Sequence, residues 1–349
     1  MRFIVVVLIL IMSVNAASKE HQLQYYSENF SDKSTSESTH LQALYFEALY
    51  QHINVLPTSY LNVAVQALAP LANNSAELYT EVQKEKLHIS DFNIDFYSES
   101  MALGVGRQTL SFDWLQGNFD GALLYGLINQ LGVKAFYFDR YSLLTPSFAT
   151  QKESLGLLGI DARLSDERTY DCNVYYYHED AGTLDGIYQT LGMGAKWQNT
   201  LFSFGLQGVY QASSIYGDEA VAKVYSNYFI SDQSALELSY SYTSDGGINH
   251  LFDYGDSRIN SFVLGNLCYL PKSRTTSLTY KYQNAEIDIH SGLGYANADT
   301  LKVLQVDGGA IWNITHSLSV SANLLLQDRQ SGDSISDFVF ANSTLAWQF

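Results

Sequence analysis

The chain has 349 residues, of which 14% are aromatic, 16% are charged and four are proline. Disordered chains have few aromatic residues and many charges. Disulfide scaffolds need more cysteines than the two present here, so both classes are excluded. A net charge of −17 argues against a nucleic-acid-binding protein, because phosphates attract Lys and Arg. No apolar run reaches about 18 residues, which excludes a helical membrane protein.

The N-terminal residues 1–16 predict a secretory signal peptide. Arg2 gives a basic start, Phe3–Met12 is continuously apolar, and Ala16 ends the segment with the small residue that a signal peptidase reads. The apolar stretch is too short to span a bilayer as a helix; a buried N-terminal strand or helix is the alternative. We therefore expect an exported protein with one mature domain, residues 17–349.

The C-terminal segment Val339–Phe349 alternates between apolar and polar residues. Its apolar residues, among them Trp347, fall on one face, and Asn342 and Gln348 fall on the other. A final strand with an aromatic carboxy-terminus resembles the assembly signal of bacterial outer-membrane barrels. Together with the export signal, it predicts a barrel in the bacterial outer membrane that the barrel-assembly machinery inserts through the strand ending at Phe349.

The same alternation recurs along the mature chain. It is regular in Ser234–Tyr242, Thr275–Gln283 and Glu286–Tyr295, and in Ser317–Asp328 only Leu325 breaks it. Because successive side chains of a strand point to opposite faces, these segments suit lipid on one side and water on the other. We count roughly 16 to 18 segments of the length that a tilted membrane strand needs. The predicted fold is an all-β transmembrane antiparallel β-barrel, with 18 strands favoured.

The N-terminal third is less regular. Gln22–Tyr26 predicts the first strand and Asn29–Thr39 a serine-rich loop, whereas His40–Ile53 and Leu61–Leu71 fit either a helical face or a strand.

Tyrosines recur near the expected strand ends, where they fit the aromatic girdles of a membrane barrel. Core packing in a secreted β-sandwich is the alternative. The tyrosines in question are Tyr175, Tyr176, Tyr177, Tyr188, Tyr210, Tyr225, Tyr228, Tyr242, Tyr269, Tyr282 and Tyr295.

Three motifs follow one another between residues 89 and 124. Phe92, Ile94 and Phe96 alternate in one segment, Gly106-Arg107-Gln108 follows, and Phe119-Asp120-Gly121 comes third. In this order and spacing they resemble the OprD-like (Opr) family of outer-membrane porins. The resemblance implies a diffusion channel for small hydrophilic solutes, in many members with 18 strands. The short, proline-free segment Thr109–Asn118 departs from many members, so the amino-acid or carboxylate selectivity of some members is not carried over.

Assigning the apolar faces to lipid leaves a set of charged residues in the lumen, because charge on the lipid face costs about 2–4 kcal/mol at the midplane. Opposite charges on facing walls would select ions or zwitterions; ordinary solvated faces with mutual ion pairs are the alternative. The expected lumen residues are Lys134, Arg140, Asp161, Arg163, Lys196, Lys223, Glu237, Lys281, Glu286, Asp288, His290 and Asp307. Arg107 shares the parity of Leu103 and Val105, and its orientation stays open.

Acidic residues gather in expected loops: Asp166–Glu167, Glu179–Asp180 and Asp253–Asp256. At a pore mouth they would concentrate cations, so a preference for cations is a hypothesis. Maintaining solubility in the periplasm, or binding divalent ions that bridge lipopolysaccharide, is the competing interpretation. Cys172 and Cys268 are expected to be small, membrane-facing side chains rather than a disulfide.

The predicted function is a porin for small hydrophilic solutes or ions in the lipid and lipopolysaccharide of the outer membrane, as a monomer or homotrimer. A non-conducting surface scaffold or adhesin is the alternative, and a barrel enzyme a weaker one. His290-Ser291 and His316-Ser317 are sequence neighbours that point to opposite faces of a strand, so neither pair can cooperate in catalysis. No metal, nucleotide or other cofactor motif is present. A transporter of hydrophobic compounds would need an apolar internal ladder, against which the polar inward faces argue.

Overall fold

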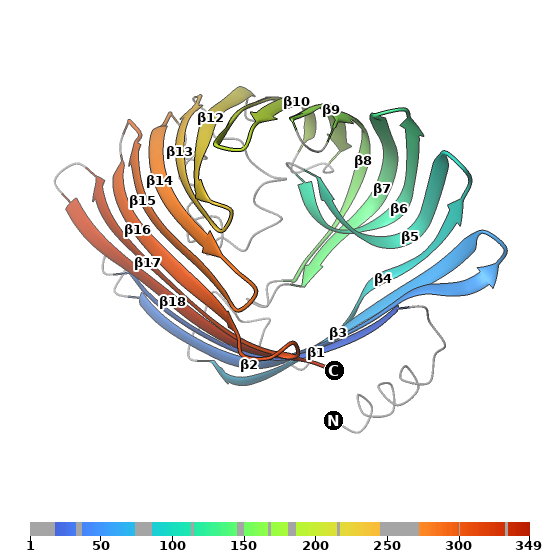
Figure 1. Cartoon of the computed structure of the whole chain (residues 1–349), viewed down its shortest axis with the longest axis horizontal. Helices are drawn as coiled ribbons and strands as arrows, with labels where there is room; N and C mark the ends of the chain where they lie inside the picture. The colour runs from blue at the N-terminus through green and yellow to red at the C-terminus, as the bar shows by residue number, and fades with distance from the viewer. Residues whose placement is uncertain are drawn as a thin grey trace.

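The computed structural model is a closed antiparallel β-barrel of 18 strands (Figure 1). It describes residues 18–32, 37–73, 86–112, 115–144, 150–166, 169–180, 186–214, 217–244, 272–299, 301–331 and 334–349. The strands are β1 (Ser18–Asp32), β2 (Glu37–Leu56), β3 (Ser59–Asn73), β4 (Lys86–Tyr97), β5 (Met101–Phe112), β6 (Leu115–Ile128), β7 (Leu131–Leu144), β8 (Thr150–Ser165), β9 (Tyr170–Asp180), β10 (Ile187–Gln198), β11 (Phe202–Ser213), β12 (Gly217–Ser231), β13 (Ser234–Thr243), β14 (Arg274–Gln283), β15 (Ile287–Asn297), β16 (Lys302–Asn313), β17 (Leu318–Ser331) and β18 (Ser334–Gln348). The predicted fold class and the favoured strand number are confirmed.

The barrel closes where the first strand meets the last. β1 and β18 are antiparallel, with Leu23 opposite Trp347 and Tyr25 opposite Leu345. The backbone N–H of Phe349 adds a hydrogen bond of 3.0 Å to the carbonyl of His21. Closure leaves no free sheet edge, which a lipid environment requires because it offers no partner for backbone groups. The C-terminal segment is therefore the strand that its alternation predicts.

The connections differ between the two ends of the barrel. At one end they are turns of two to four residues, such as Pro57-Thr58 and Asn129-Gln130, and β1 begins and β18 ends at this end. Thr58 and Asn129 have φ angles of 63° and 56°, which suits tight hairpins. At the other end lies the longest connection, residues 244–273. Uniformly short turns at one end and longer connections among those at the other are typical of outer-membrane barrels.

The outer surface is apolar. On β13, Leu238 and Tyr240 are 54% and 47% exposed, whereas the alternating Ser241 is 3% exposed. β15 repeats this pattern with an exposed Leu293 and Tyr295. Exposed apolar side chains in this number would aggregate in water, so the outer surface is one that a lipid bilayer covers.

The two N-terminal segments that fit either a helix or a strand in the sequence are strands in the structure. His40–Ile53 lies in β2 and Leu61–Leu71 in β3, and among the described residues no helix is long and apolar enough to cross a membrane. The expected loop Asn29–Thr39 is wrong at both ends, because β1 continues to Asp32 and β2 begins at Glu37. The serine-rich composition favours a loop, whereas the backbone of residues 29–32 and 37–39 continues the two strands.

Four of the expected girdle tyrosines lie inside the barrel. Tyr175, Tyr177 and Tyr188 are each 1% exposed, and Tyr225 lies over Gly205 on the inner side. Strand parity explains the correction: Tyr176 is 39% exposed, so its two neighbours in the Tyr175–Tyr177 run must point inward.

The tyrosines that do face outward include Tyr176, Tyr210, Tyr228, Tyr242 and Tyr295, each 39–57% exposed. Tyr269 lies outside the described residues, as does Cys268. Cys172 is exposed on β9.

An aromatic ladder covers part of the inner face of β6–β10. The ring centroids of Phe119 and Phe138 are 4.9 Å apart, those of Phe136 and Tyr177 are 5.4 Å apart, and Tyr177 stacks on Tyr175. The expectation of uniformly polar inward faces is therefore wrong here. All five rings are at most 2% exposed, so they pack the wall rather than offer a surface to solutes.

Glycines make room for this ladder. A Cβ at Gly192 would lie 2.0 Å from Cζ of Tyr175. We expect Gly192→Val to lower the free energy of unfolding by about 1–3 kcal/mol, because the ring cannot move within a packed wall. Gly208→Val is the matched control, since nothing lies closer than 4.0 Å to its Cβ position. Urea unfolding of the refolded barrel measures both, and equal losses would refute the packing argument.

Candidate functional site: the charged inner wall

The inner wall consists of the side chains that alternate with the exposed apolar ones. Most of the expected lumen charges lie on it: Lys134 on β7, Asp161 and Arg163 on β8, Lys196 on β10, Lys223 on β12, Glu237 on β13, Lys281 on β14, and Asp288 and His290 on β15, followed by Asp307 on β16. Glu286 lies instead in the turn before β15. Period-two parity is sufficient to place these residues, because the strands that carry them are regular.

Arg140 does not follow this parity. In the pairing with β6, a register shift in β7 falls between Phe138 and Arg140 and leaves Asp139 as an extra residue. After the shift, Arg140 pairs with Asp120 of β6, whereas Phe138 pairs with Gly121. The alternation that places Lys134 on the inner wall therefore does not extend to Arg140. A bulge of this kind leaves no signal in the sequence.

Arg107 points outward. It shares the parity of Leu103 and Val105, which are 38% and 45% exposed. Its Nε and Nη2 donate to the two carboxylate oxygens of Asp120 at 2.5 and 2.6 Å. Nη1 donates to the backbone carbonyl of Ile89 at 3.1 Å. The arginine of the Gly-Arg-Gln motif thus forms a bidentate ion pair on the lipid side of the wall.

Two ion pairs neutralise part of the inner wall. Lys281 on β14 donates to Glu237 on β13 at 2.9 Å. Arg163 on β8 binds Asp171 on β9 through two N–H groups, with Nε 2.7 Å from Oδ1. Asp171 was not among the expected residues, although its alternation with Cys172 would have placed it inside.

Other inner-wall charges lack an ion-pair partner among the residues that the structure describes. Lys196 on β10 and Lys223 on β12 are the cations; the ammonium of Lys223 lies only over the ring of Tyr225, 5.9 Å from its centroid. Asp288 on β15 and Asp307 on β16 are the carboxylates. Unpaired cations thus lie on β10 and β12 and unpaired carboxylates on β15 and β16, so the lumen is lined by charges of both signs.

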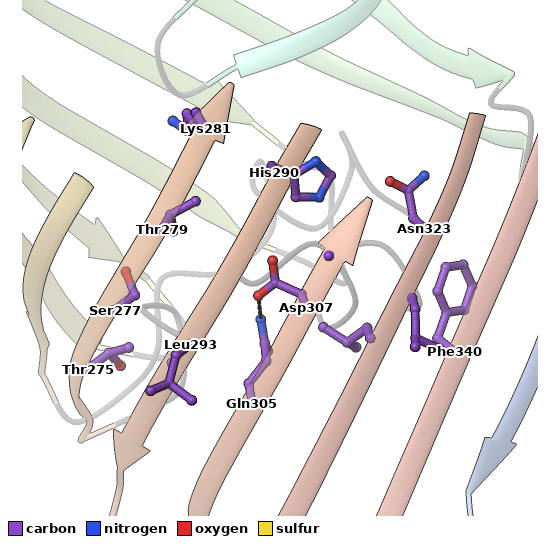
Figure 2. A pocket seen from close by; sticks show the side chains of 14 residues that line it. Thr275, Ser277, Thr279, Lys281, His290, Leu293, Gln305, Asp307, Asn323 and Phe340 are labelled. Carbon is purple, nitrogen blue, oxygen red and sulfur yellow. Dashed lines mark hydrogen bonds between the residues drawn. The ribbon is translucent and has the colours of Figure 1, made fainter. Parts of the chain in front are cut away.

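A recess of about 200 Å³ opens on the wall of β14–β18 (Figure 2). Asp307, His290 and Asn323 meet there, with Thr275, Ser277 and Thr279 along β14. Leu325 and Phe340 form its apolar side. The inward position of Leu325 explains why this residue breaks the alternation of β17.

Two further recesses lie near the short turns, on β6–β10. One, of about 610 Å³, is lined by Lys134, Asp161 and Arg163. The other, of about 270 Å³, shares Arg163 and adds Asp171 and Lys196. Figure 1 shows β7 and β8 across the barrel from β16 and β17, so these recesses lie on the side of the barrel opposite the strand that holds Asp307.

Sequence reasoning missed several inner-wall carboxylates. Asp95 accepts a hydrogen bond of 2.7 Å from Asn62, and Glu47 accepts one of 2.8 Å from Gln66. Glu219 is 4% exposed. Parity within β2, β4 and β12 was the available signal: Asp95, for example, alternates with Ile94 and Phe96.

The acidic segments expected at a pore mouth do not all lie at the same end of the barrel. Asp166 lies in the β8–β9 turn, whereas Glu179 lies at the opposite end of β9 and is 1% exposed. Glu167 and Asp253–Asp256 lie outside the described residues. Within those that are described, no three His, Cys, Asp or Glu side chains are grouped to hold a metal ion.

A closed wall, an apolar outer surface and a charged inner wall define a transmembrane β-barrel. No protein-family model and no curated protein sequence matches the chain. Solved structures do match it over nearly its whole length. OpdK of Pseudomonas aeruginosa, solved with vanillate, has a TM-score of 0.71 and 15% identity, covering 96% of this chain and 100% of OpdK.

Two further Pseudomonas aeruginosa structures agree with this comparison. OccK7 (OpdD) has a TM-score of 0.72 at 11% identity and covers 95% of this chain and 98% of its own. OpdQ has a TM-score of 0.71 at 12% identity, and the match covers 95% of this chain and 99% of OpdQ. The chain therefore has the fold of the OprD/Occ porins, the fold that the three motifs predict.

Proposed function

We propose that the protein is an outer-membrane porin, a passive channel for small hydrophilic solutes and ions that prefers cations. The inner wall carries this proposal: it is lined with charges and amides, while the outer wall is apolar. The fold likeness to the OprD/Occ barrels supports a channel rather than an enzyme. Inner-wall carboxylates that were not expected from the sequence, such as Asp95 and Glu47, add negative charge to the wall. This charge supports a preference for cations.

Export and assembly form part of the same proposal. Residues 1–16 would serve as the signal peptide and 17–349 as the barrel in outer-membrane lipid and lipopolysaccharide. The barrel-assembly machinery would recognise the strand ending at Phe349, and the barrel would act as a monomer or homotrimer. The short turns, the start of β1 and the end of β18 would face the periplasm.

Single-channel recording in a planar bilayer tests the proposal, with the reversal potential measured under a salt gradient. We expect stable conductance steps and a cation-favouring reversal potential. Stable steps that favour anions would overturn the charge argument and keep the channel. Absence of conductance from a correctly folded, heat-modifiable barrel would refute the channel and favour a surface scaffold.

A further inference from the structure

The β14–β18 recess contains a carboxylate and an amide oxygen on neighbouring strands, Asp307 on β16 and Asn323 on β17. Oδ1 of Asp307 accepts a hydrogen bond of 3.0 Å from Nε2 of Gln305, and no cation among the described residues pairs with this carboxylate. Nδ2 of Asn323 donates to Asn342 at 2.8 Å, which leaves its Oδ1 turned toward the recess. In Figure 2, Asp307, Asn323 and His290 project into one space.

The recess carries negative charge. Lys281 is the one cation that lines it, and its ammonium is bound to Glu237 at 2.9 Å. Asp307 therefore remains uncompensated. A ligand that brings several N–H donors and one positive charge would complete the hydrogen bonding and neutralise this carboxylate.

Glycines shape the space around these acceptors. Bare backbone at Gly292 lies under the carboxylate of Asp307, because a Cβ there would be 2.6 Å from Oδ1. A Cβ at Gly309 would be 2.0 Å from Oδ1 of Asn323 and 2.5 Å from Cε1 of His290. Side chains larger than glycine at either position would push the acceptor groups out of the recess.

We propose that this recess binds the primary ammonium group of small organic amines on their way through the lumen. An ammonium carries three donors and no acceptor, which matches the oxygens of Asp307 and Asn323. Leu325 and Phe340 would contact the carbon chain of the amine. The volume of about 200 Å³ is below the roughly 300–1,000 Å³ of sites for drug-sized ligands, so small solutes fit. The inference rests on the proposed function, which gives the solute access to the recess.

Ligand-observed NMR titration of the refolded full chain in detergent micelles tests the proposal, with n-butylammonium chloride as the probe. We expect saturable binding to the unmodified protein and at least about tenfold weaker binding to Asp307→Asn, since a charged hydrogen bond is lost. Asp288→Asn is the matched control, because it removes an unpaired inner-wall carboxylate that does not line the recess. Gly309→Ala provides a second test that keeps every charge, and we expect weaker binding because its Cβ displaces Asn323.

Several results of this titration would each overturn the proposed amine binding. No binding, equal affinity of Asp307→Asn and the unmodified protein, or an equal loss in Asp288→Asn would overturn the proposal. Binding of tetramethylammonium as strong as that of butylammonium would also overturn it, because that ion has no N–H donor. The titration needs no conductance. A conducting barrel that fails to bind the probe refutes only the recess, and a binding barrel without conductance refutes only the channel.

Discussion

Asp120→Asn is expected to lower the free energy of unfolding of the membrane-inserted barrel by about 2–4 kcal/mol. Arg107 and Asp120 face each other across β5 and β6 on the lipid side, where Leu103 and Leu124 are their exposed neighbours. An arginine facing lipid near the midplane costs about 2–4 kcal/mol. Removing its carboxylate leaves the guanidinium uncompensated where water cannot solvate it.

The backbone around the pair is arranged to complete its hydrogen bonds. A register shift between β3 and β4 skips Ser90, next to the carbonyl of Ile89 that accepts from Arg107. Gly106 has φ 123°, and a Cβ there would lie 2.3 Å from the carbonyl of Phe92, so only glycine fits before Arg107. Gln108 turns inward and donates to the carbonyl of Gly104 at 3.2 Å.

Urea unfolding in lipid vesicles, with heat modifiability as the folding check, measures the effect. The double variant Arg107→Leu with Asp120→Leu is the matched comparison. We expect it to regain most of the lost stability, because replacing both charges by apolar groups removes the desolvation cost as well as the attraction. A single variant as stable as the unmodified barrel, or a double variant as unstable as the single, would contradict this account.

The strands and their outward faces were predictable because period-two alternation depends only on the order of residues within one strand. The regular segments Ser234–Tyr242 and Thr275–Gln283 became β13 and β14 with the expected faces. In the run Tyr175–Tyr177 every position is aromatic, so composition alone does not show which of the three side chains lie inside.

Pairing between strands was not predictable, because register is a relation between distant segments. Arg107 has a parity that sequence reveals, but Asp120 as its partner follows only from the β5–β6 register. Likewise, the inner-wall position of Lys281 was predicted, whereas its neutralisation by Glu237 depends on the β13–β14 register. Bulges add a second limit: one extra residue at Asp139 ends the parity that predicted the position of Arg140.

The unpaired charges of the inner wall are expected to set the ion selectivity of the channel. Asp288→Lys combined with Asp307→Lys is expected to move the reversal potential toward anions and to lower the cation-to-anion permeability ratio by about tenfold. Through water, a unit charge acts on an ion about 8 Å away with about 0.5 kcal/mol. The double variant changes the wall by four charge units, and salt screens part of the effect.

Two matched variants separate uncompensated charge from total charge. Lys196→Glu with Lys223→Glu is expected to shift the reversal potential in the opposite direction, because the substitution replaces two unpaired cations of the inner wall by carboxylates. Exchanging the ion pair, Glu237→Lys with Lys281→Glu, keeps both the net charge and the pairing, so we expect little change in the permeability ratio. If the exchanged pair shifted the ratio as far as Asp288→Lys with Asp307→Lys, selectivity would depend on single positions rather than on the balance of unpaired charge across the lumen.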